Sequence, residues 1–307
     1  MIHQTAETDR RITPAVAIRR VTAVVNSAAG GVGPGASEAL QALLNEFGLD
    51  SRVIAPSPED IVAALQSAVE SRPDLIIVLA GDGTAGLAAD LCGPDGPLLA
   101  PLPGGTMNML PHAIYGNRPW RDCLISALSE GQERLISAGE AGGRRFYCAA
   151  ILGSPALWAP AREAIRLWDL KAAWRHAVYA FRRAFTSHLR LDVDGKRHKA
   201  IALGLICPLV SRAVDHEQAL EAALLNVQDA AQAFHLGLTH AFRDWREDPA
   251  VTTEACETGH ARARRPIPCL IDGELHRLGR SVEFRFVPRG FRALVPAPPA
   301  DARRIAP

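Results

Sequence analysis

The sequence predicts an α/β N-terminal domain with a mostly parallel sheet, followed by a C-terminal, mainly antiparallel β-sandwich domain. In the first half of the 307 residues, short apolar runs alternate with segments of helical periodicity, as in parallel strands joined by helices. From Leu189 onward, alternating apolar and polar runs are joined by Asp-Gly turns, which indicates antiparallel hairpins. We therefore expect two domains of different architecture.

The elements of the first domain follow one another at short intervals. Its apolar runs are predicted to be strands, at 20–26, 51–54, 75–80 and 98–101. Its helical segments carry apolar residues on one face, at 35–48, at 58–72 and after the turn at 80–84. Because strand and helix alternate, we expect the strands to run parallel.

The second half begins with a long helical stretch at 156–185 and then becomes rich in strands. Its strands are expected within 189–207, around the Asp-Gly turn at 272–273, and within 282–296. Residues 137–145 (SAGEAGGRR) have the composition of a linker, so we place the two domains at 20–140 and 141–290. The strand at 291–297 is a candidate to return to the first domain.

The composition argues against several classes of protein. The formal net charge of +1 provides no global attraction to nucleic acid, and we expect no nucleic-acid partner. The six cysteines show no CxxC pair and no zinc-ligand spacing, so a disulfide framework is not expected. The N-terminus lacks the apolar core of a signal peptide, and no run approaches the about 20 apolar residues of a membrane span. We therefore expect a cytoplasmic protein; its oligomeric state leaves no signal in the sequence.

Three glycine-rich turns follow predicted strands of the first domain: NSAAGGVG at 26–33, AGDGT at 80–84 and PGGTMN at 103–108. The carboxyl ends of parallel strands are where α/β sheets bind ligands, because free backbone N–H groups and helix N-termini there attract anions. Glycine lets the backbone approach a phosphate closely, and a carboxylate such as Asp82 can hold the accompanying divalent cation. Neither GxxxxGK[ST] nor GxGxxG occurs, which disfavours P-loop and dinucleotide-binding proteins.

These motifs resemble a known family. AGDGT is similar to the GGDGT signature of the diacylglycerol kinase catalytic domain, which sphingosine and ceramide kinases share and NAD kinases share more distantly. PLPGGTMNML at 101–110 and CLIDGEL at 269–275 are similar to two further motifs of that family, in the same order. The resemblance covers about residues 20–297 and implies a nucleotide-binding first domain, a lipid-binding second domain and an active site between them.

The resemblance also implies the roles of individual residues. Asp82 would lie near Mg²⁺, Glu274 would be the general base that accepts the proton of the lipid hydroxyl, and Asp272 would belong to the same catalytic motif. The ATP site would be lined by Asn26, Gly30, Gly31, Gly81, Gly83, Thr84, Gly104, Gly105, Thr106 and Asn108. Taken alone, Asp272-Gly273-Glu274 favours a plain hairpin turn, and the other motifs in order favour the catalytic site.

Several positions depart from the family pattern and leave alternatives open. Ala80 replaces the first glycine of GGDGT, and Met109 stands where an Asp commonly follows the Asn. The implied function is ATP-dependent transfer of the γ-phosphate to a lipid hydroxyl, of diacylglycerol or sphingoid type. The first alternative is a degenerate member that binds nucleotide or lipid without catalysis, and the second is a kinase with a soluble acceptor. Aromatic and basic residues at 158–185 are compatible with peripheral contact at the inner membrane face or with a helix packed on the second domain.

Overall fold

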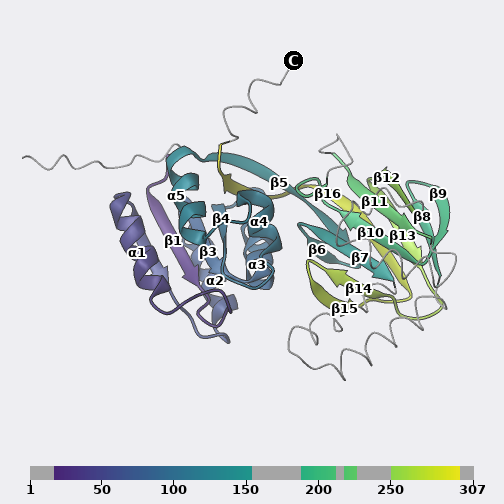
Figure 1. Ribbon diagram of the computed structural model, residues 1–307, viewed down its shortest axis with the longest axis horizontal. Coiled ribbons are helices and arrows are strands. Elements are labelled where there is room, and N and C mark those ends of the chain that lie inside the picture. The colour runs from purple at the N-terminus through teal and green to yellow at the C-terminus, as the bar shows by residue number, and fades with distance from the viewer. Residues whose placement is uncertain (1–16, 154–187, 212–217, 227–249, 298–307) are drawn as a thin grey trace, which may run out of the picture. The chain divides into compact units, whose positions relative to one another are not determined.

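The computed structural model describes residues 17–153, 188–211, 218–226 and 250–297 (Figure 1). The chain forms two compact units, Met1–Leu135 with Phe291–Pro307 and Ile136–Gly290. The helix expected at 156–185 lies outside the described residues. Within the described ranges, no helix is both long and apolar enough to cross a bilayer.

The first unit is built on a parallel sheet with the strand order β2-β1-β3-β4 (Figure 1). Its strands are β1 (Arg20–Val25), β2 (Asp50–Ile54), β3 (Leu75–Ala80) and β4 (Leu98–Pro103). Its helices are α1 (Ala36–Glu46), α2 (Ile61–Glu70), α3 (Asp82–Cys92), α4 (Met109–Tyr115) and α5 (Trp120–Glu130). This architecture confirms the predicted α/β class of the N-terminal half.

Both faces of the parallel sheet are buried, which explains why its strands are apolar without alternation. Every residue of β3 is buried. On one face, Leu75 and Ile77 join a core that includes α1 and α5. On the other face, Ile76 and Val78 are equally inaccessible, and α2 and α3 contact the strands. Two layers of helices therefore hold the sheet and fix where its strands end.

The second unit contains two antiparallel sets of strands. Its strands are β6 (Arg144–Phe146), β7 (Ala149–Gly153), β8 (Leu189–Val193), β9 (Lys196–Ala200), β10 (Ala202–Ile206), β11 (Leu220–Leu225), β12 (Val251–Cys256), β13 (Thr258–Arg262), β14 (Pro268–Ile271) and β15 (Glu274–Arg277). Two further strands, β5 (Gln132–Ala141) and β16 (Ser281–Val295), each have residues in both units. One set has the order β12-β11-β10-β7-β14-β15, and the other has the order β16-β13-β8-β9. Leu152 and Leu203 from the first set share a buried core with Leu191 and Phe284 from the second. The antiparallel C-terminal sheets confirm the second part of the predicted fold class.

Residues 137–145 are not the linker that their composition suggested. They form the end of β5 and a two-residue turn, and Ala141 pairs with Arg144 at the start of β6. Gly142 and Gly143 occupy the turn with φ of 58° and 76°, a region that favours glycine. Gly139 lies under the buried ring of Phe146, where a side chain would collide. The glycines that resembled a linker are therefore requirements of a tight hairpin.

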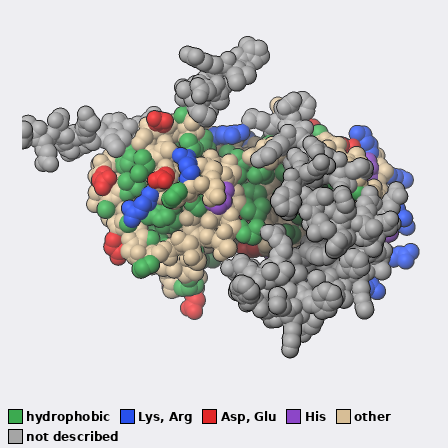
Figure 2. Space-filling model, viewed as in Figure 1, with side chains coloured by type: hydrophobic (Ala, Val, Ile, Leu, Met, Phe, Trp, Pro, Cys, Tyr) green, Lys and Arg blue, Asp and Glu red, His purple; other side chains and the backbone are tan. Residues whose placement is uncertain are grey.

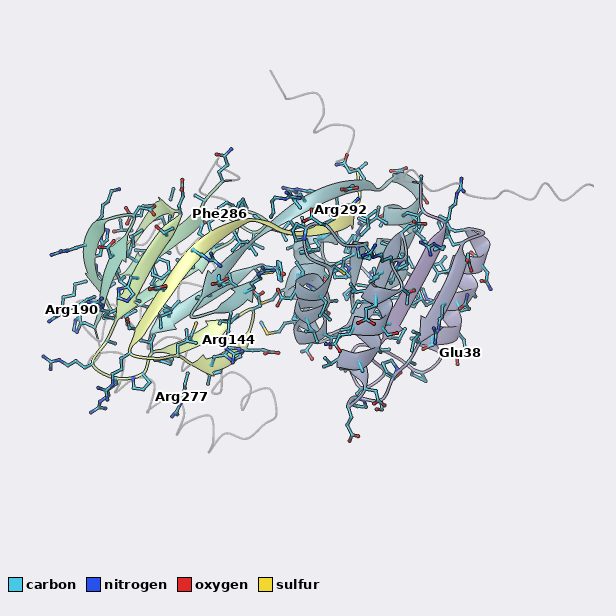
Figure 3. The ribbon with its side chains drawn as sticks, turned by 180° about the vertical axis from the view of Figure 1, so that it is seen from behind. Glu38, Arg144, Arg190, Arg277, Phe286 and Arg292 are labelled. Carbon is cyan, nitrogen blue, oxygen red and sulfur yellow. The ribbon has the colours of Figure 1, made fainter. Side chains whose placement is uncertain are left out.

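The last strand runs through both units. β16 begins in the second unit and ends in the first, where Ala293 pairs in parallel with Leu99 of β4. Within the first unit, Arg292 donates to both carboxylate oxygens of Glu133, at 2.6 and 2.7 Å, and to the carbonyl of Gly96 at 3.0 Å (Figure 3). The C-terminal segment is thus attached to the first unit by a strand pairing and a bidentate ion pair.

Asp74 joins the amino ends of β1 and β3. Its Oδ2 accepts the backbone N–H groups of Arg20 at 2.8 Å and of Arg19 at 2.9 Å. These hydrogen bonds hold the pKa of Asp74 below its ordinary value of 3.8. Ionised Asp74 therefore stabilises the fold above that value, and the contribution is lost as the pH falls through the lowered pKa.

We expect Asp74→Asn to reduce the free energy of unfolding at neutral pH by about 0.5 kcal/mol. The loss is small because the carboxylate is largely exposed and solvent screens its charge. Urea unfolding at about pH 7 and about pH 2 measures it, and the difference between variant and wild type should shrink at the lower pH. An equal difference at both values would show that the charge of Asp74 does not contribute.

Candidate active site

The three glycine turns lie at the carboxyl ends of adjacent strands. The first turn (Asn26–Gly33) follows β1, the second (Ala80–Thr84) follows β3, and the third (Pro103–Asn108) follows β4. β1, β3 and β4 are neighbours in the parallel sheet (Figure 1), so the turns meet at one edge. In open α/β sheets this edge is the usual position of a ligand site.

The turns contact one another through their backbones. The N–H of Gly31 donates to the carbonyl of Gly104 at 2.9 Å, which joins the first turn to the third. A Cβ added to Gly105 would lie 2.6 Å from the Cα of Gly81, and one added to Gly31 would lie 2.8 Å from the oxygen of Gly105. The three turns can therefore approach this closely only because these positions are glycine. The sequence predicts that these glycines contact phosphate; in the structure they let the turns pack on each other.

Two asparagines brace the turns. Asn26 Nδ2 lies 3.5 Å from Thr84 Oγ1, and Asn26 Oδ1 accepts the N–H of Ala28 at 3.1 Å. Buried Asn108 has a φ of 50° and exchanges two hydrogen bonds with Gly105, at 2.7 and 3.0 Å. Asn108 therefore closes the third turn on itself, and Asn26 connects the first turn to the second.

Asp82 is the only carboxylate in the three turns. It begins α3, and its Oδ1 accepts the N–H of Leu110 at the start of α4, at 3.2 Å. Burial raises the pKa of Asp82 above its ordinary 3.8, while the backbone N–H groups of residues 108–110 and the nearby His112 oppose that shift. The contact with α4 was not predicted, because no local signal connects positions 28 residues apart.

The donor set fits a magnesium ion that is delivered with a nucleotide. The part of the chain that the structure describes contains no group of three or more His, Cys, Asp or Glu side chains able to hold a metal. Mg²⁺ is commonly bound by one or two carboxylates, with substrate phosphates and water as its other ligands. Asp82 can supply one such carboxylate, so a preformed all-protein cage is not required.

In the second unit, Asp272 has a structural task. Asp272 and Gly273 form the two-residue turn between β14 and β15, with φ of 41° and 90°. The carboxylate accepts the N–H groups of Tyr147 at 2.7 Å, Cys148 at 3.0 Å and Ala149 at 2.9 Å. Both of its oxygens are thus engaged in holding the β14–β15 turn against the start of β7.

Glu274 is in a different environment from Asp272. Its side chain is 61% exposed at the start of β15, and its Oε2 lies 3.8 Å from Nε2 of His276. An exposed carboxylate can exchange a proton with substrate and solvent. His276 was not predicted as a neighbour of Glu274, although a spacing of two along a strand places both side chains on one face.

The structure brings together the predicted residues of the first unit at one sheet edge. They are Asn26, Gly30, Gly31, Gly81, Asp82, Gly83, Thr84, Gly104, Gly105, Thr106 and Asn108. Asp272 and Glu274 belong to the second unit. The roles of all these residues in binding or catalysis remain predictions.

A separate cavity of about 650 Å³ opens at the opposite edge of the parallel sheet. It is lined by residues that precede β3 and β4, including Asp74 and Gly96, and by the Glu133–Arg292 pair. The charged groups of Asp74 and Arg292 already have protein partners. The glycine-turn edge therefore remains the better candidate site.

We expect Gly105→Ala to destabilise the protein by about 1–3 kcal/mol, because the new methyl group would force the second and third turns apart. Gly86→Ala is the matched control: the position lies inside α3 with open space around it, so it should stabilise by about 0.5–1 kcal/mol. Thermal unfolding of both variants gives the comparison. A Gly105→Ala protein as stable as wild type would contradict the close packing of the turns.

Comparisons with known proteins agree with this geometry. Residues 20–141 match the family model of the diacylglycerol kinase catalytic domain, whereas no curated protein sequence matches the chain. The fold is similar to that of a diacylglycerol kinase from Bacillus anthracis str. Sterne, with 17% identity, a TM-score of 0.64, and coverage of 93% of this chain and 99% of that one.

Two further structures from the same organism, provisionally assigned as diacylglycerol kinases, are also similar. One has 18% identity, a TM-score of 0.67 and coverage of 93% and 99%, and the other has 16%, 0.68 and coverage of 91% and 98%. At these identities the likeness establishes the fold of both units. The three glycine turns and Asp82 all lie within residues 20–141, the segment that matches the diacylglycerol kinase catalytic-domain model.

Proposed function

We propose that the protein is an ATP-dependent lipid kinase that transfers the γ-phosphate of ATP to a lipid hydroxyl. The observation that carries the proposal is the meeting of three glycine turns and one carboxylate at the carboxyl edge of the parallel sheet. This edge lies within the residues that match the family of diacylglycerol kinase catalytic domains. The inner face of the cytoplasmic membrane is the compartment in which such a substrate would be met.

The first turn of α3 supports binding of the phosphates. The first N–H groups of any helix lack partners within that helix and carry partial positive charge. In α3 they belong to the segment that begins with Asp82, Gly83 and Thr84, directly after β3. Gly83 is exposed, so a phosphate oxygen can approach the backbone there. Thr84 adds a hydroxyl that Asn26 holds in place.

Transfer requires charge neutralisation and removal of one proton. Mg²⁺ bound with ATP would neutralise phosphate charge, and Asp82 would contribute one of its ligands. Glu274 would accept the proton of the lipid hydroxyl while the hydroxyl oxygen forms a bond to the γ-phosphorus. The bond between that phosphorus and the β,γ-bridging oxygen breaks, which leaves ADP and a phosphorylated lipid. Asp272 would act as a positioning residue, because its carboxylate holds the turn that precedes Glu274.

Binding without catalysis is the second candidate function. It is favoured by one observation: Asp82 is the only carboxylate of the three turns, and one of its oxygens already accepts the N–H of Leu110. Incubation with γ-labelled ATP, magnesium and a mixed lipid extract separates the candidates. Label in the organic phase supports the lipid kinase, and label on a water-soluble product would identify a soluble acceptor. ATP binding without any labelled product would leave the binding function.

We expect Asp82→Asn to lower the turnover number by at least about 100-fold, because the variant loses the charge that helps to hold the metal. The amide oxygen can still accept the N–H of Leu110, so folding should be retained. Asp90→Asn, at an exposed position of the same helix, is the control and should keep full activity. Full activity in Asp82→Asn would remove Asp82 from the mechanism.

We expect Glu274→Gln to lower the turnover number by about 10²–10⁴-fold with little effect on ATP affinity, because it removes the proton acceptor but not the phosphate site. Steady-state kinetics and equilibrium ATP binding measure the two effects separately. Glu257→Gln, at another exposed position of the second unit, serves as the control. If Glu274→Gln and Glu257→Gln both have the turnover number of the wild type, Glu274 is not the general base.

A further inference from the structure

A row of three cations crosses the antiparallel sheet of the second unit. The strand register places Lys199 of β9 opposite Arg190 of β8, and Arg190 opposite Arg262 of β13. All three residues are exposed. The row ends at Ser281 of β16, which is the partner of Arg262 on its other side.

The row faces away from the core. Leu189 and Leu191, on either side of Arg190, are buried in the core of the second unit, and so is Ala261 beside Arg262. Because side chains alternate along a strand, the cations point to the opposite face. Figure 3 shows Arg190 projecting outward, and Figure 2 shows Lys and Arg side chains gathered along the part of this unit that carries β8 and β9.

The charge of the row is not neutralised within the described part of the protein. None of the three side chains forms an ion pair with an acidic residue of the described segments. Arg262 donates to the ring of His260 at 3.4 Å, which supplies no negative charge. Like charges placed directly opposite in a sheet are destabilising. The fold therefore tolerates an unfavourable arrangement that a negatively charged partner would relieve.

The surroundings of the row carry charges of both signs. Arg264 is also exposed and lies two residues beyond Arg262, past the end of β13. The neighbouring row contains two carboxylates, Asp192 and Glu283, together with Arg197 and His260. Oδ1 of Asp192 already accepts the N–H of Gly195 at 2.9 Å.

We propose that this cation row is a docking surface for an anionic membrane, with Lys199, Arg190 and Arg262 contacting lipid phosphates. An open sheet face can meet a lipid surface with several side chains at once, and basic residues near an anionic leaflet are attracted to it. The outward positions of the two rows contain no Phe, Tyr or Trp side chain on which bases could stack, which disfavours single-stranded nucleic acid. The choice of a membrane also rests on the proposed function, whose acceptor is a lipid.

Sedimentation of the full chain with lipid vesicles, without nucleotide, tests the docking surface. The variant combines Arg190→Gln, Lys199→Gln and Arg262→Gln. The control combines Arg52→Gln, Arg121→Gln and Arg144→Gln, exposed positions outside the row that give the same change in net charge. With phosphatidylserine in phosphatidylcholine vesicles, we expect the control to bind like wild type and the row variant to bind on the order of 100-fold more weakly. Binding of the wild type should weaken as salt is added.

Equal binding of the row variant and the control would overturn the proposal. It would also be overturned if the row variant kept its vesicle binding and lost binding to duplex DNA. Thermal unfolding shows whether the variant is folded, and its midpoint should equal or exceed that of wild type because a like-charge row has been removed.

The kinase proposal fails separately from the docking proposal. Phosphate transfer to detergent-dispersed lipid should be equal in the row variant and wild type. The wild type could transfer no phosphate to any lipid preparation and still bind anionic vesicles through the row. That result would refute the kinase proposal and support the docking surface.

Discussion

The close approach of three backbone turns is the constraint on which the rest of the first unit depends. Gly31, Gly104 and Gly105 lie where any side chain would strike a neighbouring backbone, so the turns meet at main-chain distance. That contact determines where α3 starts, and α3 in turn carries Asp82. Asp82 then reaches the first residues of α4. The first N–H groups of a helix lack partners within that helix, so the start of α3 is suited to the phosphate site that we propose.

Prediction from sequence succeeded where the signal was local. The apolar strand at 75–80 and its glycine turn needed only periodicity and turn chemistry, and both are present. Helix α5, Trp120–Glu130, was not predicted. Its buried face is set by packing on the sheet and not by a capping signal. The supposed linker at 137–145 failed for a similar reason, because turn glycines and linker glycines have the same composition.

Two carboxylates in one hairpin illustrate why the second unit could be predicted only in part. The Asp-Gly pair at 272–273 correctly indicated a turn. It could not show that Asp272 is held by the backbone of residues 147–149, more than a hundred positions earlier. Glu274 begins the next strand and stays exposed. The hairpin interpretation of Asp272-Gly273-Glu274 is therefore confirmed, whereas the catalytic role of Glu274 stays a prediction.

The last strand has a consequence for how the chain is made. Leu294 is part of the core of the first unit, and its carbonyl accepts the hydroxyl of Tyr115 at 2.8 Å. The first unit is therefore discontinuous in sequence, and its core lacks a member until β16 has been synthesised. A chain emerging from the ribosome cannot complete its N-terminal unit before its C-terminal unit, as a chain of two sequential domains would. Final closure of the first unit is thereby linked to the synthesis of β16.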